Sequence, residues 1–265
     1  MHTVVLGIEI LGLSIFIALI GLYLVRRIVG VDKLKSHHEV AGFIIGIVGT
    51  IYAVLLAFMV VVEWTKYQDA STLVTTEANL LGDISRMAES LPNDQRKQVL
   101  TELRDYAQLV TEKEWPALAN GQVDDKTTDM LNSLWRSYVI EMKPSTPQDI
   151  TLYGESLKRL NDLSDTRRLR INTSRDTVPS VLWALLIGGG VMTVAFTFFF
   201  GVSDVRAQFL MVAALTAEIA FILLLVVALD NPFKGDLAVS ADPIREQSDH
   251  IGGRLVKGGF GVQVI

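Results

Sequence analysis

Four long apolar segments, almost free of charged residues, limit the fold of this chain more than any other feature. They are Val4–Val25, Val40–Val62, Val178–Phe200 and Val205–Leu229. A helix needs about 20 predominantly apolar residues to cross the hydrocarbon core of a bilayer. All four segments meet that length, and the second has 23 residues without a charge. The first has too long an apolar run for a signal peptide and no small-residue cleavage site after it. We therefore predict an integral membrane protein with four spans.

The second span is predicted to continue as a helix beyond the membrane. The polar stretch Glu63–Ala70 contains no proline or glycine that would end a helix. Apolar residues then recur at the three- and four-residue spacing of a helical seam, at Leu73, Leu80, Ile84, Met87 and Leu91. A helix over Ala41–Leu91 would be roughly 75 Å long. Other helices, or other copies of the chain, must cover its seam, and we expect the polar domain to self-associate through it.

The polar block between the second and third spans shows only helical patterns. Pro92 ends the long helix, and Asn93 or Asp94 can cap a second helix that reaches Trp115. Further helices are predicted over Thr127–Glu141 and from Pro147 to Arg170. No strand-like alternation is found. The fold class is therefore all-α. Spans 1 and 2 lie in residues 1–62, a helical domain in 63–177, spans 3 and 4 in 178–229, and a tail in 230–265. The tail has too few apolar residues for another span.

The composition excludes several kinds of chemistry. The chain has no cysteine, which rules out disulfides, thiolate metal sites and cysteine nucleophiles. Its formal net charge of −5 and the absence of a long basic tract argue against nucleic acid as a partner. His37-His38-Glu39 is interpreted as a polar helix entrance, because neighbouring helix positions do not face one another. We predict no metal, no cofactor and no enzymatic activity, because no nucleophile–base pair or phosphate loop is present.

Within the spans, three groups of residues are candidates for packing or function. Gly42, Gly46 and Gly49 on the second span favour close helix packing, with a hinge or a narrow pore as the alternative. A different face of that span carries an apolar stripe that faces lipid, a neighbouring helix or a pore axis: Ile47, Ile51, Val54 and Phe58. Gly188–Gly190 on the third span indicate close packing or a bend. Glu218 lies near the centre of the fourth span, where a carboxylate is either functional or protonated and hydrogen-bonded.

Arginine residues crowd the approach to the third span, at Arg167, Arg168, Arg170 and Arg175. Such a cluster can concentrate anions in a vestibule or bind lipid headgroups. Thr177 can cap the third span, with Pro179 in its first turn.

Several local patterns together resemble the bacterial bestrophin-like membrane family. The patterns are Tyr52–Phe58 leading into Glu63-Trp64, Asp69-Ala70 and Glu77-Ala78; Tyr106 followed by Glu114-Trp115-Pro116; Arg167–Arg170; and Leu229–Gly235, with Asp230, Pro232, Phe233 and Gly235. They are spread over most of the chain.

The resemblance implies an oligomeric channel in the bacterial inner membrane. Bestrophins are pentameric chloride channels with four spans, a cytosolic helical domain between spans two and three, and second helices that line the pore. The family thus implies that the stripe Ile47–Phe58 lines a pore, and that small inorganic anions, the lipid bilayer and other copies of the chain are the partners. The acidic run of the bestrophin calcium clasp is missing, since Lys234–Ala238 contains only Asp236. Calcium gating is therefore not implied.

Two other functions fit the same pattern. A non-conducting membrane scaffold or sensor would also combine a membrane bundle with a helical stalk. A proton-driven stator-like unit shares four spans and a large loop, with Glu218 as its proton carrier, but such units keep more polar residues on spans three and four. The numbers of Lys and Arg residues on the two sides of the membrane do not decide on which side the helical domain lies. The family resemblance favours the cytosolic side. We prefer the channel.

Overall fold

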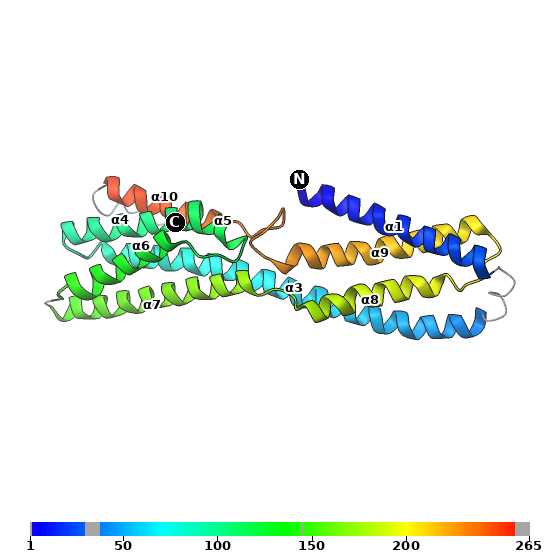
Figure 1. Ribbon diagram of the computed structural model, residues 1–265. Helices are drawn as coiled ribbons and strands as arrows, with labels where there is room; N and C mark the ends of the chain where they lie inside the picture. Colours follow the sequence, from blue (N-terminus) through cyan, green and yellow to red (C-terminus); the bar gives the residue numbers. More distant parts are fainter. Residues whose placement is uncertain (1, 30–37, 145, 258–265) are drawn as a thin grey trace. The chain divides into compact units, whose positions relative to one another are not determined.

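The computed structural model describes residues 2–29, 38–144 and 146–257. All regular secondary structure in these ranges is helical, which confirms the predicted fold class (Figure 1). The described chain forms two compact units. The membrane unit consists of residues 1–65, 177–230 and 235–237, and the polar unit consists of residues 66–176, 231–234 and 238–265.

The membrane unit contains the four predicted spans. They are helix α1 (His2–Val29), the first part of α3 (His38–Ala88), α8 (Ser180–Thr197) and α9 (Val205–Asp230). Helix α9 packs against α1 and α8. The third span is shorter than predicted because Pro179 is the N-cap of α8, so Thr177 does not cap it. Many apolar side chains of these helices are exposed, among them Ile8, Phe16 and Phe221. Lipid or other copies of the chain must cover so large an apolar surface.

Helix α3 is continuous over 51 residues, as the absence of proline and glycine from Glu63–Ala70 predicted. It ends at Ala88, and a turn at Glu89-Ser90 precedes Pro92. Pro92 is the N-cap of the next helix, α4 (Asn93–Leu109), without a side-chain hydrogen bond. The prediction that Asn93 or Asp94 caps this helix is therefore wrong, because both residues lie inside its first turn.

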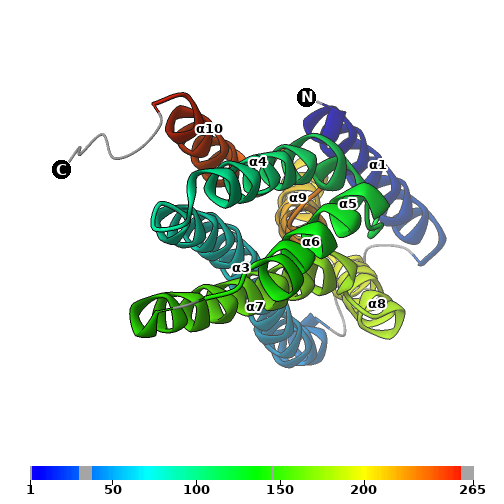
Figure 2. The same ribbon diagram turned by 90° about the vertical axis from the view of Figure 1, so that its left-hand side faces the viewer.

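The polar unit is a bundle around a single apolar core. After α4 come a π-helical turn η1 (Val110–Glu114), the short helix α5 (Trp115–Leu118), α6 (Asp125–Arg136), a second π-helical turn η2 (Ser137–Glu141) and α7 (Pro147–Arg175). The side chain of Asp124 caps α6, and Thr146 and Asp149 form a capping box on α7. Helix α4 lies between α6 and α10 (Figure 2).

The apolar seam of α3 lies inside this core. Leu80 and Ile84 are buried with residues of the same chain such as Leu103 and Leu163. The prediction that the polar domain self-associates through the seam is therefore wrong. Helical spacing identified the apolar face, but it could not show that helices of the same chain cover it.

The tail adds an element that the sequence interpretation did not predict, helix α10 (Asp242–Lys257). It packs along α4 and buries Ile244 and Ile251 in the core of the polar unit. Only a few apolar residues at helical spacing mark this helix, which is too weak a signal to distinguish it from a loop.

Candidate functional site

A cluster of buried charged side chains lies in the polar unit. The carboxylate of Glu77, on α3, accepts hydrogen bonds from Arg170 of α7, at 2.6 Å from Nε and 3.1 Å from Nη2. Nη2 of Arg170 also donates to Oε1 of Glu114, at 2.7 Å. Arg167, one turn earlier on α7, pairs with the same Glu114 carboxylate and donates to Oγ1 of Thr128 at 3.0 Å. The negative charges of two carboxylates therefore cancel the positive charges of two guanidinium groups.

The cluster is held away from solvent. The side chains of Glu77, Glu114 and Arg170 have a relative exposure of 0%. Burial alone lowers the pKa of Arg170, but the charges of Glu77 and Glu114 and the hydrogen bond to Glu77 outweigh it, so the pKa lies above its ordinary value. Removing one member would leave an uncompensated buried charge, which is strongly destabilising. The four charges therefore depend on one another.

Tyr106 of α4 completes the cluster. Its hydroxyl donates to Oε1 of Glu77 at 2.7 Å. Burial, followed by the charge of Glu77, raises the pKa of Tyr106 well above its ordinary value, so the phenol stays protonated. Its hydrogen bond joins α4 to the charges on α3 and α7.

Trp115 connects the cluster to the segment after the fourth span. The guanidinium of Arg170 lies 5.3 Å from the centre of the Trp115 ring, within the range of a cation–π contact. The same indole packs edge-to-face on Phe233, with ring centroids 5.4 Å apart, and donates to the carbonyl of Val239 at 3.3 Å. Nearby, the carbonyl of Pro232 accepts from the backbone of Val239. Motifs that are far apart in sequence thus meet in one place.

The π-helical turn η1 explains how Glu114 reaches this position. Pro116 has no N–H, and its ring clashes with a carbonyl in the preceding turn of a regular α-helix. The chain widens to π geometry over Val110–Glu114 and resumes α geometry at Trp115. Turns of this kind often occur at functional positions in proteins. Helix α5 then ends at Leu118, and a turn follows in which Gly121 has φ 65°.

The predicted arginine cluster does not act as one group. Arg167 and Arg170 are buried and paired with carboxylates, so we do not assign them to an anion vestibule or to lipid headgroups. Arg168 is exposed and pairs with Asp165 on the same helix. Nε of Arg175 donates to the carbonyl of Gly121 at 2.9 Å. The sequence placed the four arginines together, but their directions around α7 separate them.

In the membrane unit, the predicted apolar stripe of α3 is exposed. Relative exposures are 49% for Ile47, 66% for Ile51 and 65% for both Val54 and Phe58. The opposite face of the helix is buried by the same chain: Tyr52, Leu56 and Met59. The stripe is therefore a surface that helices of its own chain leave uncovered.

The exposed face continues along α3 within the polar unit, but its chemistry changes. The spacing of the stripe leads on to Thr65, Asp69, Thr72 and Thr76, with Gln68, Thr75 and Asn79 beside them, and all of these are exposed. Most of these side chains carry hydroxyl or amide groups, and Asp69 adds one carboxylate. The sequence interpretation did not single them out as a group, although the three- and four-residue spacing from Phe58 would have identified them.

Gly42, Gly46 and Gly49 of α3 are not closely packed within the single chain. A methyl group added at Gly46 or Gly49 would meet nothing within 4 Å, and at Gly42 only Phe200 at 3.8 Å, among the described residues. Close packing occurs at Gly189 and Gly190 of α8, which is one of the two explanations that we predicted for the glycines of that span. A Cβ at Gly189 would lie 2.6 Å from the ring of Tyr52.

Two acidic residues of α9 differ in their surroundings. Glu218 is exposed in the single chain, in the middle of its helix. Asp230 ends that helix, and its carboxylate accepts from the backbone N–H of Val178 at 2.7 Å. Gly235, the last residue of the same motif, has φ 86°, which favours glycine.

The described residues contain no group of three His, Cys, Asp or Glu side chains that could hold a metal ion. His37 and the side chains of His38 and Glu39, which we interpreted as a polar helix entrance, lie outside the described residues.

Comparisons with known proteins identify the fold and the family. A family model described as a bestrophin-like domain matches residues 12–244. A crystal structure of a variant of a bacterial bestrophin homolog from Klebsiella pneumoniae has a TM-score of 0.66 and 13% identity, covering 94% of this chain and 99% of that chain. Another variant of that homolog has a TM-score of 0.68 and 13% identity, covering 95% and 98%. At such identities the structures show the fold alone. No curated protein matches.

Proposed function

Because this chain belongs to the bestrophin-like family, we propose that it is a subunit of a homo-oligomeric anion channel in the bacterial inner membrane. In this proposal several copies, five by the family resemblance, surround an axis in the bilayer. The uncovered face of α3 in each copy lines the conducting path, and small inorganic anions pass along it. The helical domain lies in the cytosol. No nucleic acid takes part.

The exposed stripe of α3 is the observation that carries this proposal. Ile51, Val54 and Phe58 leave a continuous apolar face uncovered, although the opposite face of the same helix is packed by its own chain. Copies arranged around an axis with these faces inward would form an apolar constriction. Apolar constrictions in channels act as gates because they exclude water.

The neutral polar residues further along α3 are compatible with the same proposal. An anion path must bind anions weakly enough to release them. The amide groups of Gln68 and Asn79 can donate hydrogen bonds without a fixed charge. The hydroxyl of Thr72 now donates to the carbonyl of Gln68 at 3.0 Å, and rotation of the O–H would redirect it. In this proposal hydroxyl and amide groups, with the carboxylate of Asp69 among them, replace the arginine-lined vestibule that the sequence suggested.

Halide flux into reconstituted vesicles tests the proposal. We expect Phe58→Ala to raise the flux, because removing the bulkiest side chain of the stripe widens the ring and lets it wet. Val54→Ala should give a smaller rise. Phe16→Ala on α1 is the matched control, because this phenylalanine is similarly exposed, at 62%, but lies on another helix. Its flux should equal that of the wild type.

The alternative role of Phe58 is packing against another subunit. In that case Phe58→Ala would leave a cavity that costs about 3–5 kcal/mol and would weaken the oligomer without any flux. If wild type and both stripe variants form folded oligomers that pass no halide, the channel proposal is wrong. A non-conducting scaffold or sensor whose helical domain binds a partner would then be the better account.

A further inference from the structure

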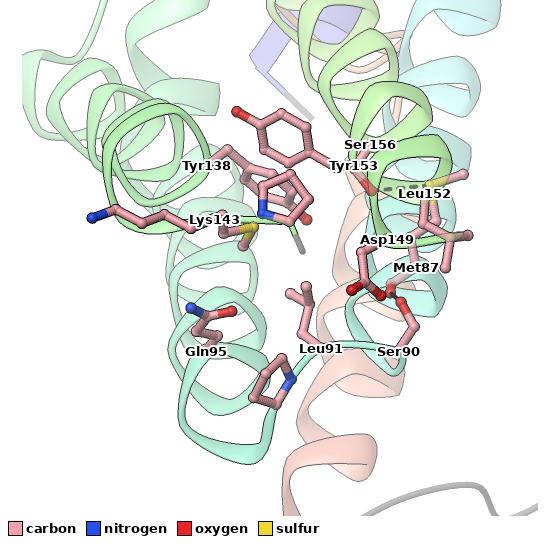
Figure 3. A pocket seen from close by; sticks show the side chains of 13 residues that line it. Met87, Ser90, Leu91, Gln95, Tyr138, Lys143, Asp149, Leu152, Tyr153 and Ser156 are labelled. Atoms are coloured by element: carbon pink, nitrogen blue, oxygen red, sulfur yellow. Dashed lines mark hydrogen bonds between the residues drawn. The ribbon is translucent and has the colours of Figure 1, made fainter. Parts of the chain in front are cut away.

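A cavity of about 420 Å³ lies in the polar unit, where α3 ends and α4 begins (Figure 3). The turn η2 and the start of α7 form its other walls. Apolar side chains from three of these elements line it, including Met87, Met142 and Leu152. Cavities that bind small molecules in proteins have volumes of about 300–1,000 Å³ and combine apolar walls with a few polar groups.

One polar group of this cavity is left unsatisfied. Tyr138 on η2 is 1% exposed, and its hydroxyl has no hydrogen-bond partner among the described residues. Its polar side-chain neighbour is Ser156, which lowers the pKa of Tyr138 slightly against the larger effect of burial. Ser156 makes no regular hydrogen bond with it and donates its own hydroxyl to the sulfur of Met87 at 3.4 Å. Burial raises the pKa of Tyr138, which keeps its O–H available as a donor at neutral pH. Buried polar groups in proteins are nearly always hydrogen-bonded, so we expect the Tyr138 hydroxyl to bind a partner in this cavity.

Two charged residues belong to the lining of the cavity, Asp149 and Lys143. The carboxylate of Asp149 caps α7, where it accepts from the backbone of Thr146 at 3.0 Å. Lys143 is exposed, and Figure 3 shows its side chain extending away from the other labelled residues. An anionic ligand would therefore lose its hydration beside a carboxylate, without gaining a paired positive charge in return.

We propose that this cavity binds an uncharged small organic molecule whose carbonyl or hydroxyl oxygen accepts a hydrogen bond from Tyr138. The apolar body of the ligand packs against Met87, Met142 and Leu152. The thioether groups of the two methionines suit an aromatic ring, because sulfur and aromatic rings make favourable contacts. The site does not depend on whether the chain conducts ions.

Fluorine NMR with para-fluoroacetophenone as the probe tests the proposal, using the full chain in lipid nanodiscs. This ketone is neutral and aromatic and carries one acceptor oxygen. Empty nanodiscs measure its partition into lipid. We expect saturable binding above that background, and a more than tenfold loss in Gln95→Trp, whose indole would fill the cavity from α4. Gln108→Trp, at an exposed position on the same helix, is the control and should bind as the wild type does.

Tyr138→Phe separates a binding role from a structural one. It should weaken probe binding about three- to tenfold, the range for one neutral hydrogen bond. Without the probe its melting temperature should stay within about a degree of the wild type or exceed it, because among the described residues the hydroxyl makes no regular hydrogen bond and its polar side-chain neighbour is Ser156. The proposal is overturned if the ketone does not bind above the nanodisc background, or binds equally to Gln95→Trp. Tighter binding of para-fluorobenzoate than of the ketone would also overturn it, since the site would then select an anion.

Discussion

Replacement of Glu77 by glutamine tests whether the buried cluster stabilises the polar unit as one system. The substitution keeps the size of the side chain but removes its charge. The carboxylate accepts from Nε and Nη2 of Arg170, and from Tyr106 at 2.7 Å. A glutamine can accept at one oxygen only, and its NH₂ group would face a donor.

The expected cost follows from the charges that remain. With Glu77 neutral, the positive charges of Arg167 and Arg170 face Glu114 alone, in a site without solvent. Removing one partner of a buried pair typically costs about 3–5 kcal/mol. For a unit of this size, each 1 kcal/mol lowers the melting temperature by roughly 2–4 °C. We therefore expect a decrease of about 6–20 °C.

Thermal unfolding followed by circular dichroism in detergent measures this change. Glu155→Gln is the control, because Glu155 pairs with Arg159 at the surface, where both side chains are more than a third exposed. Such pairs contribute about 0–1 kcal/mol. The double variant Glu77→Gln with Arg170→Met keeps the cluster neutral, so it should be less destabilised than the two single changes added together.

If Glu77→Gln melts within a degree or two of the surface control, the cluster does not carry the stability that its burial implies. Additive effects in the double variant would equally contradict the coupling between Glu77 and Arg170.

Three further predictions concern sidedness, packing and pH. The chain has no cysteine of its own, so an introduced cysteine reports on one position. Asn120→Cys should resist an impermeant maleimide in intact cells, whereas Ser203→Cys, in the loop after the third span, should react. The reverse pattern would place the helical domain outside the cell. Gly189→Ala should lower the melting temperature in detergent, because overpacking costs about 1–3 kcal/mol, while Gly46→Ala should not lower it unless another subunit packs there. The free energy of unfolding should fall above about pH 10. Burial keeps Tyr106 protonated in the folded state, whereas the unfolded chain loses that proton. Unfolding curves at alkaline pH should therefore show a weaker pH dependence for a Tyr106→Phe variant.

The spans and the continuity of α3 could be predicted from the sequence because they depend on local properties. Length and hydropathy identify a membrane helix, and the absence of proline and glycine from Glu63–Ala70 predicts that the helix continues. The exposed stripe from Ile47 to Phe58 also follows from helical spacing, although its environment in an assembly does not.

The partners of buried side chains could not be predicted in the same way. Arg170 looked like a surface cation because the glutamates that neutralise it, Glu77 and Glu114, are 93 and 56 residues away in sequence. The π-helical turn that directs Glu114 inward has no clear local signature beyond Pro116. Several of the patterns that suggested the family contain the residues of this cluster, since Arg170 and Phe233 both contact Trp115. The family resemblance therefore pointed indirectly to the partners of the buried charges.

A structure of the purified assembly in lipid nanodiscs tests the central proposal most directly. We predict a closed ring of identical subunits with an open axis, in which α3 of every copy lies nearest the axis and Ile51, Val54 and Phe58 face it. A monomer, or a ring in which these side chains face lipid, would contradict the account.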